Sequence, residues 1–272
     1  MVEGFARGAT AQGARSHQED RHVIVRQSIM CGADWGWRLA VMDGHGGSEC
    51  VDFCKPCIEE FFEADLMINN PAVLRQAIKV VINKTMAFYS GCTLSVVWIS
   101  EPNAIAHVAH MGDSLVAIKG TRGLRLSTEH NIRTNEQERL AIIERGGRCD
   151  SQNMYFIHPA SGNGLQPTRG LGDAEFSQWL SREPETFSVR LDDSSFVLLA
   201  TDGLLDPSHR KSREEQMSSI TRLVDEGANA QDLVNDALRR RTGDNVTVVL
   251  WKPPIVLTAT GARPVFSFCD II

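Results

Sequence analysis

The feature that most constrains this chain is a recurring junction at which a short apolar run ends in aspartate and glycine. In one example the run Leu39–Met42 is followed at once by Asp43, Gly44, His45 and two more glycines. Apolar runs this short, bounded by glycine, are typical of buried strands. The pattern predicts a rigid strand with Asp43 at its end, where a carboxylate could hold a hard cation and His45 could transfer a proton. For this stretch alone, an ordinary turn with a solvated aspartate stays open.

The same junction recurs elsewhere in the chain. Asp202 follows the apolar run 196–201, Asp244 precedes an apolar run at 245–251, and Asp113 lies in a fourth glycine-containing turn. Together these residues suggest a shared acidic cluster, because crowded carboxylates repel one another unless cations neutralise them. Oxygen ligands without cysteine or histidine select hard ions such as Mg²⁺ or Mn²⁺. The pattern indicates a two-metal hydrolytic site, in which a bridging carboxylate would hold a hydroxide between the ions.

Composition narrows the class of protein without fixing its domain count. The 272 residues are 42% hydrophobic and 23% charged, which is ordinary for a soluble globular protein with a sizeable core. A formal net charge of -6 leaves no footprint for nucleic acid. The sequence contains neither a membrane-spanning apolar run nor a signal peptide. We therefore expect an intracellular monomer, cytoplasmic or nuclear, with no nucleic-acid partner.

The seven cysteines are an odd number and are expected to be reduced thiols. Cys50, Cys54 and Cys57 are spaced as one face of a helix. Buried packing is the favoured interpretation, because free cysteine usually behaves as a small hydrophobe. A redox pair or a zinc site stays open as an alternative, although no fourth ligand lies close by in sequence.

Hydrophobic periodicity and turn residues predict the order of the elements. Strands are expected over 2–12, 21–29, 92–99, 104–110, 115–119, 196–201 and 245–251, with a strand and loop over 38–47. Helices are expected over 48–64, 71–89, 133–145, 212–226 and 230–240. Residues 148–170 are rich in Gly, Pro, Ser and Asn, and they predict a loop with a short strand near 154–157.

A series of short motifs in this chain resembles that of the metal-dependent type 2C protein serine/threonine phosphatases. The segments that carry the resemblance are Arg15–Asp20, Val41–Gly47, Gly91–Thr93, Met111–Ser114, Leu126–His130, Glu138–Arg139, Gly146–Gly147, Thr168–Asp173, Thr201–Asp206 and Gly243–Val248. The resemblance covers about residues 3–251, and the order of many motifs is far more specific than any one of them.

The resemblance implies an α+β fold, a four-layer α-β-β-α sandwich of two packed antiparallel sheets flanked by helices. It implies a catalytic domain over residues 1–252 and leaves 253–272 as a C-terminal extension. Val265–Phe268 in this extension could add an edge strand or a docking segment. Cys269–Ile272 has the outline of a prenylation box, but an ordinary tail is favoured because no polybasic stretch precedes it.

The resemblance also implies two Mg²⁺ or Mn²⁺ ions at one edge of the sandwich, with a third in some members. Asp43 would bridge the two ions, and Gly44 would give a backbone carbonyl to one of them. The other positions carried over are Asp202 and Asp244 as ligands of the second ion, Asp113 with Asp202 at the additional ion, and Glu19 and Asp20 as holders of metal-bound waters.

The residue types suit the hydrolysis of phosphoserine and phosphothreonine in proteins by in-line attack of the bridging hydroxide. Arg15 can grip two phosphate oxygens at once, which lysine cannot. The departing alkoxide needs a proton, and His45 is predicted to supply it as the general acid. A surface arginine and a structural histidine are the respective alternatives.

Two other functions stay open. The first is a non-catalytic phosphatase-fold scaffold that binds a phosphoprotein or a kinase, and only the segment 148–170, which departs from the family pattern, supports it. The second is a two-metal nuclease or phosphodiesterase, which the acidic composition disfavours. The departures from the family pattern bear on substrate access more than on metal chemistry.

Overall fold

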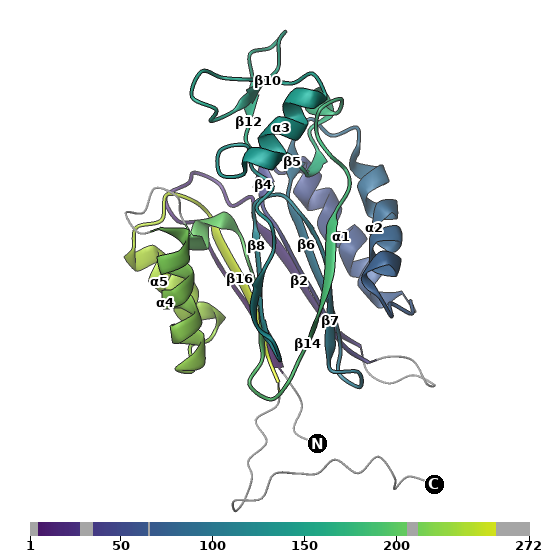
Figure 1. The fold of residues 1–272 in the computed structure, drawn as a ribbon, viewed down its shortest axis with the longest axis vertical. Coiled ribbons are helices and arrows are strands. Elements are labelled where there is room, and N and C mark those ends of the chain that lie inside the picture. The colour runs from purple at the N-terminus through teal and green to yellow at the C-terminus, as the bar shows by residue number, and fades with distance from the viewer. Residues whose placement is uncertain (1–4, 28–34, 65, 206–211, 254–272) are drawn as a thin grey trace, which may run out of the picture.

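Two five-stranded antiparallel sheets lie at the centre of the molecule (Figure 1). This computed structural model describes residues 5–27, 35–64, 66–205 and 212–253. The first sheet has the order β1 (Phe5–Ala11), β16 (Val246–Lys252), β15 (Phe196–Ala200), β8 (Leu115–Gly120) and β9 (Gly123–Leu126). The second has the order β14 (Glu185–Arg190), β7 (Ile105–Met111), β6 (Leu94–Ser100), β3 (Gly36–Met42) and β2 (Arg21–Gln27).

Strand β3 shows why the central strands are continuously apolar. Successive side chains of a strand point to opposite faces of the sheet. Leu39 and Val41 pack against the other sheet, where they meet side chains such as Val197 of β15. Ala40 and Met42 point the other way, into a core shared with helices. Both faces of β3 are therefore buried, and this accounts for the unbroken apolar run in the sequence.

Helices cover the outer face of each sheet and complete four layers (Figure 1). Helices α1 (Glu49–Glu63) and α2 (Pro71–Thr85) pack on the second sheet. Helices α4 (Arg213–Asp225) and α5 (Ala230–Arg239) pack on the first. The start of α2 follows the predicted chemistry, since the Asn70 side chain accepts hydrogen bonds from two backbone N–H groups and proline occupies the first turn. The predicted α-β-β-α sandwich is confirmed.

The segment 148–170 is more ordered than the sequence predicted. It forms a three-stranded sheet of β10 (Arg148–Cys149), β11 (Phe156–Ile157) and β12 (Gly164–Leu165), where only one short strand was expected. Helix α3 (Glu136–Glu144) lies beside this sheet at one end of the molecule (Figure 1). A separate cluster of buried aromatic and aliphatic side chains, including Phe156, fills this region.

A second three-stranded sheet brings together strands from three of the sequence motifs. It has the order β13 (Leu171–Gly172), β5 (Gly91–Cys92) and β4 (Gly44–His45). Strands β9 and β14 of the large sheets were not predicted either. The proposed edge strand and prenylation box near the C-terminus lie outside the described residues. Among the helices that the structure describes, none combines the length and the apolar content needed to cross a membrane.

Candidate active site

The four predicted aspartates lie at the ends of central strands. Asp43 directly follows β3, and Asp113 lies in the turn between β7 and β8. Asp202 begins a short 3-10 turn after β15, and Asp244 precedes β16. Strands β15 and β16 are antiparallel neighbours, so the end of one lies beside the start of the other. The sheet topology thus brings Asp202 and Asp244 to a common edge, as the sequence predicted.

Glycine at position 203 makes the close approach of these two aspartates possible. A Cβ atom on Gly203 would lie 1.9 Å from the carbonyl oxygen of Asn245 and 3.4 Å from Cβ of Asp244. The first distance is far below 3.0 Å, a limit that real Cβ atoms essentially never cross, whereas the second is an ordinary van der Waals contact. Only a residue without a side chain therefore lets the turn after β15 lie against the start of β16.

Asp43 is the electrostatic centre of the site. Its pKa is raised well above the ordinary aspartate value, first by burial and then by the charges of four other carboxylates. Those carboxylates are Asp20, Asp202, Asp113 and Asp244. Carboxylates from five separate segments of the chain therefore act on one another. Repulsion of this kind is costly, and a divalent cation relieves it.

The Asp20 carboxylate also has features that favour a cation nearby. One carboxylate oxygen accepts a hydrogen bond from Oγ1 of Thr201 at 2.8 Å, whereas the other is buried without a hydrogen-bond partner among the described residues. Burial raises the pKa of Asp20 to about 7, although the bonds from Thr201 and Thr247 oppose the shift. A buried carboxylate oxygen without a hydrogen-bond donor is suited to accept a hydrogen bond from a water molecule that is bound to a cation.

The candidate ligand atoms are of the kind that hard divalent ions prefer, but they lie further apart than they would around a bound ion. All the candidate ligands are oxygen atoms, the preference of Mg²⁺ and Mn²⁺. Among the described residues, no three carboxylates bring ligand oxygens within 4.8 Å of one another. Asp43, Asp202 and Asp244 therefore lie further apart than direct ligation of one ion requires. Small side-chain rotations or water ligands, which Mg²⁺ retains readily, would complete the coordination.

The backbone around Asp43 is held by Thr93, which follows β5. The Asp43 N–H donates to Oγ1 of Thr93 at 3.0 Å, and the Thr93 N–H donates to the Asp43 carbonyl at 2.9 Å. A Cβ atom on Gly44 would lie 2.7 Å from the carbonyl oxygen of Glu19. The absence of a side chain at Gly44 therefore lets Glu19 lie directly beside the candidate metal ligands.

Asn245 is a positioning residue whose role the sequence did not reveal. Its side-chain oxygen accepts from the Glu19 N–H at 2.9 Å. Its side-chain nitrogen donates to the carbonyl oxygens of Gln12 and His17 at 2.7 and 2.8 Å. Asn245 is buried, and it fixes the loop that carries Arg15 and Glu19 against the start of β16. The motif Gly-Asp-Asn was visible in the sequence, but these partners lie more than 220 residues away.

Arg15 lies at the exposed rim of the acidic cluster. Its guanidinium donates to Oδ2 of Asp244 at 2.6 Å, and about half of the side chain remains exposed. Burial alone would lower the pKa of Arg15, but Asp244 chiefly, with help from Asp202 and Asp43, raises it. An incoming phosphate would meet this arginine where it already faces the carboxylates.

His45 is paired with Asp173, a residue for which the sequence gave no role. Nε2 of His45 lies 2.9 Å from both carboxylate oxygens of Asp173. Burial alone would lower the pKa of His45, but the charge and hydrogen bond of Asp173 outweigh it and raise the pKa. A Cβ atom on Gly91 would lie 2.1 Å from Oδ2 of Asp173, so only glycine admits this carboxylate. In the sequence, the feature that could have pointed to Asp173 was its place in the motif Thr168–Asp173.

A pocket of about 280 Å³ opens beside the acidic cluster. Asp113 and Asp202 line it together with Arg133 and Arg213. The Asp113 carboxylate accepts a hydrogen bond from the Asn131 side chain at 2.6 Å. The pocket is thus lined both by two candidate metal ligands and by cationic side chains that could bind a phosphorylated peptide.

Comparison with known proteins agrees with this geometry. Residues 6–246 match the family described as Protein phosphatase 2C. The chain belongs to the protein phosphatase 2C family. It is 29% identical to Protein phosphatase 2C homolog 1 of Saccharomyces cerevisiae over 261 residues, which cover 87% of this chain and 88% of that protein. Some relatives are much longer than this chain. One is a protein kinase and PP2C-like domain-containing protein of Arabidopsis thaliana, which is 28% identical over 88% of this chain, and the match covers 37% of that protein.

Solved structures of serine/threonine phosphatases share the fold. Serine-threonine phosphatase 2C from Toxoplasma gondii superposes with a TM-score of 0.66 at 22% identity, over 92% of this chain and 94% of that one. The catalytic domain of serine threonine protein phosphatase PstP gives a TM-score of 0.59 at 19% identity, over 92% and 98%. That phosphatase was solved in complex with two manganese ions.

Proposed function

We propose that this chain is a metal-dependent protein phosphatase that hydrolyses phosphoserine and phosphothreonine. The observation that carries the proposal is the convergence of Asp20, Asp113, Asp202 and Asp244 on the half-buried Asp43. Family membership over residues 6–246 supports the same reaction. We assign the catalytic domain to residues 1–252, with phosphorylated proteins as substrates.

We assign the ions to the oxygen donors of this cluster. Asp43 would be shared between two Mg²⁺ or Mn²⁺ ions, with Gly44, Asp202 and Asp244 as the other ligands and Asp113 available to a third. When bound, such ions offset the charge of a phosphate dianion and lower the pKa of water enough to supply a nucleophile near neutral pH. Glu19 and Asp20 would orient water at this site, and for Asp20 the support is that one carboxylate oxygen has no hydrogen-bond donor among the described residues.

Arg15 and His45 would act on the substrate itself. Arg15 would exchange part of its contact with Asp244 for two phosphate oxygens, which a planar guanidinium can bind together. His45 would give a proton to the departing serine or threonine oxygen. Asp173 keeps the imidazole in its charged form and fixes its orientation, which makes Asp173 a positioning residue.

One experiment tests the proposal against a non-catalytic scaffold. Turnover of a phosphothreonine peptide and of p-nitrophenyl phosphate is measured with Mn²⁺, with EDTA, and in the Asp202→Asn variant. We expect metal-dependent hydrolysis of both monoesters that the substitution abolishes. The exposed Asp193→Asn serves as a matched control and should retain full turnover. Binding of the phosphopeptide without turnover would favour the scaffold, and activity confined to phosphodiesters would favour a nuclease.

A further inference from the structure

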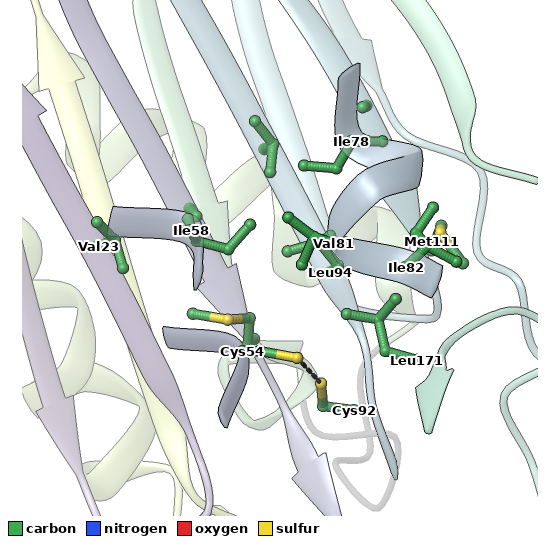
Figure 2. Packing of buried hydrophobic residues seen from close by; sticks show 14 of the residues in the cluster. Val23, Cys54, Ile58, Ile78, Val81, Ile82, Cys92, Leu94, Met111 and Leu171 are labelled. Atoms are coloured by element: carbon green, nitrogen blue, oxygen red, sulfur yellow. Dashed lines mark hydrogen bonds between the residues drawn. The ribbon is translucent and has the colours of Figure 1, made fainter. Parts of the chain in front are cut away.

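Three cysteines meet in the core next to β4, the strand that directly follows Asp43. Cys50 lies in the first turn of α1, Cys54 lies one turn later, and Cys92 ends β5. All three side chains are fully buried. Sγ of Cys92 lies 3.9 Å from Sγ of Cys50 and 3.8 Å from Sγ of Cys54. Figure 2 shows the side chains of Cys54 and Cys92 pointing toward each other between helix and sheet.

The spacing of the sulfur atoms fits a shared metal ion. The three Sγ atoms lie within 4.8 Å of one another. Thiolates that bind one ion through bonds of about 2.3 Å stand roughly 3.8 to 4.0 Å apart. In the folded chain, the two distances from Cys92 therefore match the sulfur–sulfur distances expected around one metal ion. We propose that Cys50, Cys54 and Cys92 form a binding site for one soft monovalent ion, Cu(I).

The number and chemistry of the donors select Cu(I) over the other common ions. Three sulfur ligands exclude Mg²⁺ and Mn²⁺, which prefer oxygen. Structural zinc sites are almost always four-coordinate. Among the described residues, no fourth histidine, cysteine or carboxylate joins this group, and the buried position leaves no room for ordinary solvent access. The three sulfur atoms can complete the coordination of a soft ion that binds three ligands.

Arg182 supplies positive charge beside the sulfur atoms. Its guanidinium interacts electrostatically with Cys50, Cys92 and Asp173. It donates to the carbonyl oxygens of Gly170 and Gly172, while its Nε atom is buried without a hydrogen-bond partner among the described residues. Binding of Cu(I) forms three S–Cu bonds, releases the three S–H protons to solvent and changes no oxidation state. The arginine would offset part of the negative charge that remains on the thiolates.

The sulfur cluster touches the backbone that carries the catalytic residues. Cys92 pairs with Gly44 on one side and with Leu171 on the other. A Cβ atom on Gly172 would lie 2.8 Å from Sγ of Cys50, and Asp173 follows this glycine. An ion at the three sulfurs would therefore tie together β4, β5, β13 and α1, which support Asp43 and His45.

The test is a titration of the reduced, metal-free 272-residue chain with Cu(I) in the absence of oxygen, with bicinchoninate as competitor. We expect one tightly bound Cu(I) per chain, sulfur-only ligation by X-ray absorption spectroscopy with bonds of about 2.3 Å, and a higher melting temperature. The Cys54→Ala and Cys92→Ala variants should each weaken binding by at least about 100-fold, since even the loss of an outer partner costs 10- to 100-fold.

Cys57→Ala is the matched control, because Cys57 lies on the same helix outside the group. This variant should bind Cu(I) like the wild type. Near-ultraviolet circular dichroism of each metal-free variant verifies that it is folded. Equal affinity in all four folded proteins would overturn the proposal, as would oxygen or nitrogen ligands in the spectrum. Conversion of the cysteines to a disulfide during the titration, with no copper retained, would overturn it as well.

Discussion

Asp43 of the acidic cluster directly precedes β4, and Cys92 of the sulfur cluster belongs to β5, the strand paired with β4. The first gathers oxygen donors that repel one another and raise the pKa of Asp43. The second gathers thiols in van der Waals contact in an apolar core. One backbone thus presents hard donors at an edge of the sandwich and soft donors inside it. The comparison teaches that donor chemistry, rather than position, decides which ion each cluster can take.

The largest effect should come from removing the central carboxylate. We expect Asp43→Asn to lower the turnover of a phosphothreonine peptide by at least about a thousandfold, because a metal ligand contributes several kcal/mol to transition-state stabilisation. The steady-state rate with saturating Mn²⁺ measures this effect. Cu(I) binding at the sulfur cluster should be unchanged. If Asp43→Asn kept turnover within tenfold of the wild type, the acidic cluster would not be the catalytic centre.

The same variant should be more stable than the wild type in EDTA. The pKa of Asp43 is raised by burial and by neighbouring carboxylates, so its charged form destabilises the metal-free fold above the ordinary aspartate pKa. The amide removes that charge, and we expect a gain of about 1 kcal/mol. Urea unfolding at pH 7 measures it. A loss of stability would show that the carboxylates do not repel one another in the folded chain.

His45 and Asp173 lie where the two clusters approach each other, and they offer the next largest effect. His45→Gln should lower turnover of the phosphothreonine peptide by about 100-fold, the lower range for general acid catalysis. p-Nitrophenyl phosphate should be nearly unaffected, because nitrophenolate departs without a proton. Asp173→Asn should change the ratio of the two rates in the same direction by a smaller factor. Equal losses on both substrates would assign His45 a structural role instead.

Arg15 tests the outer rim of the acidic cluster. Arg15→Lys keeps the charge but loses the paired contact with phosphate oxygens. We expect KM for the phosphopeptide to rise roughly ten- to thirtyfold, within the range for hydrogen bonds to charged groups, while kcat changes less. Initial rates over a range of peptide concentrations separate the two constants. A fall in kcat at constant KM would place Arg15 in ion binding through Asp244 rather than in substrate binding.

The sequence predicted the acidic cluster better than the sulfur cluster, for physical reasons. Asp43, Asp202 and Asp244 each stand at a strand end that local apolar periodicity reveals. The helical spacing of Cys50 and Cys54 was equally visible, and their burial is confirmed. Cys92 joins them only through sheet pairing, which no local pattern encodes. The pairing of Asp173 with His45 depends in the same way on contacts between β4, β5 and β13.

Elsewhere, tertiary contacts overrode the local pattern. Helix α3 was predicted, yet its apolar residues Leu140 and Ile143 are exposed while Glu138 is buried. Glu138 accepts hydrogen bonds from Thr168 and Arg169, which replace the water lost on burial. Strand β14 was missed because it is an edge strand with mostly half-buried residues and little apolar contrast. Partners distant in sequence decide both features.

A pair of buried histidines extends the comparison to pH. The rings of His110 and His130 are stacked with centroids 5.0 Å apart. Burial lowers the pKa of His110 to about 4 and that of His130 to about 2. Below pH 6.5 the unfolded chain therefore binds protons that the folded chain does not. This pair should destabilise the fold as the pH falls, whereas the raised pKa of Asp20 acts in the opposite direction.

The His130→Asn variant isolates the contribution of one ring. The slope of the unfolding free energy between about pH 6.5 and pH 4.5 should decrease by about 1.4 kcal/mol per pH unit relative to the wild type. Urea unfolding in EDTA at pH 7, 6 and 5 measures the slope, and subtraction of the two proteins cancels the carboxylates. The half-buried His158, which lies outside the stacked pair, provides the control variant His158→Asn for the loss of a histidine ring. Parallel slopes for His130→Asn and the wild type would mean that the buried ring accepts a proton in the folded state.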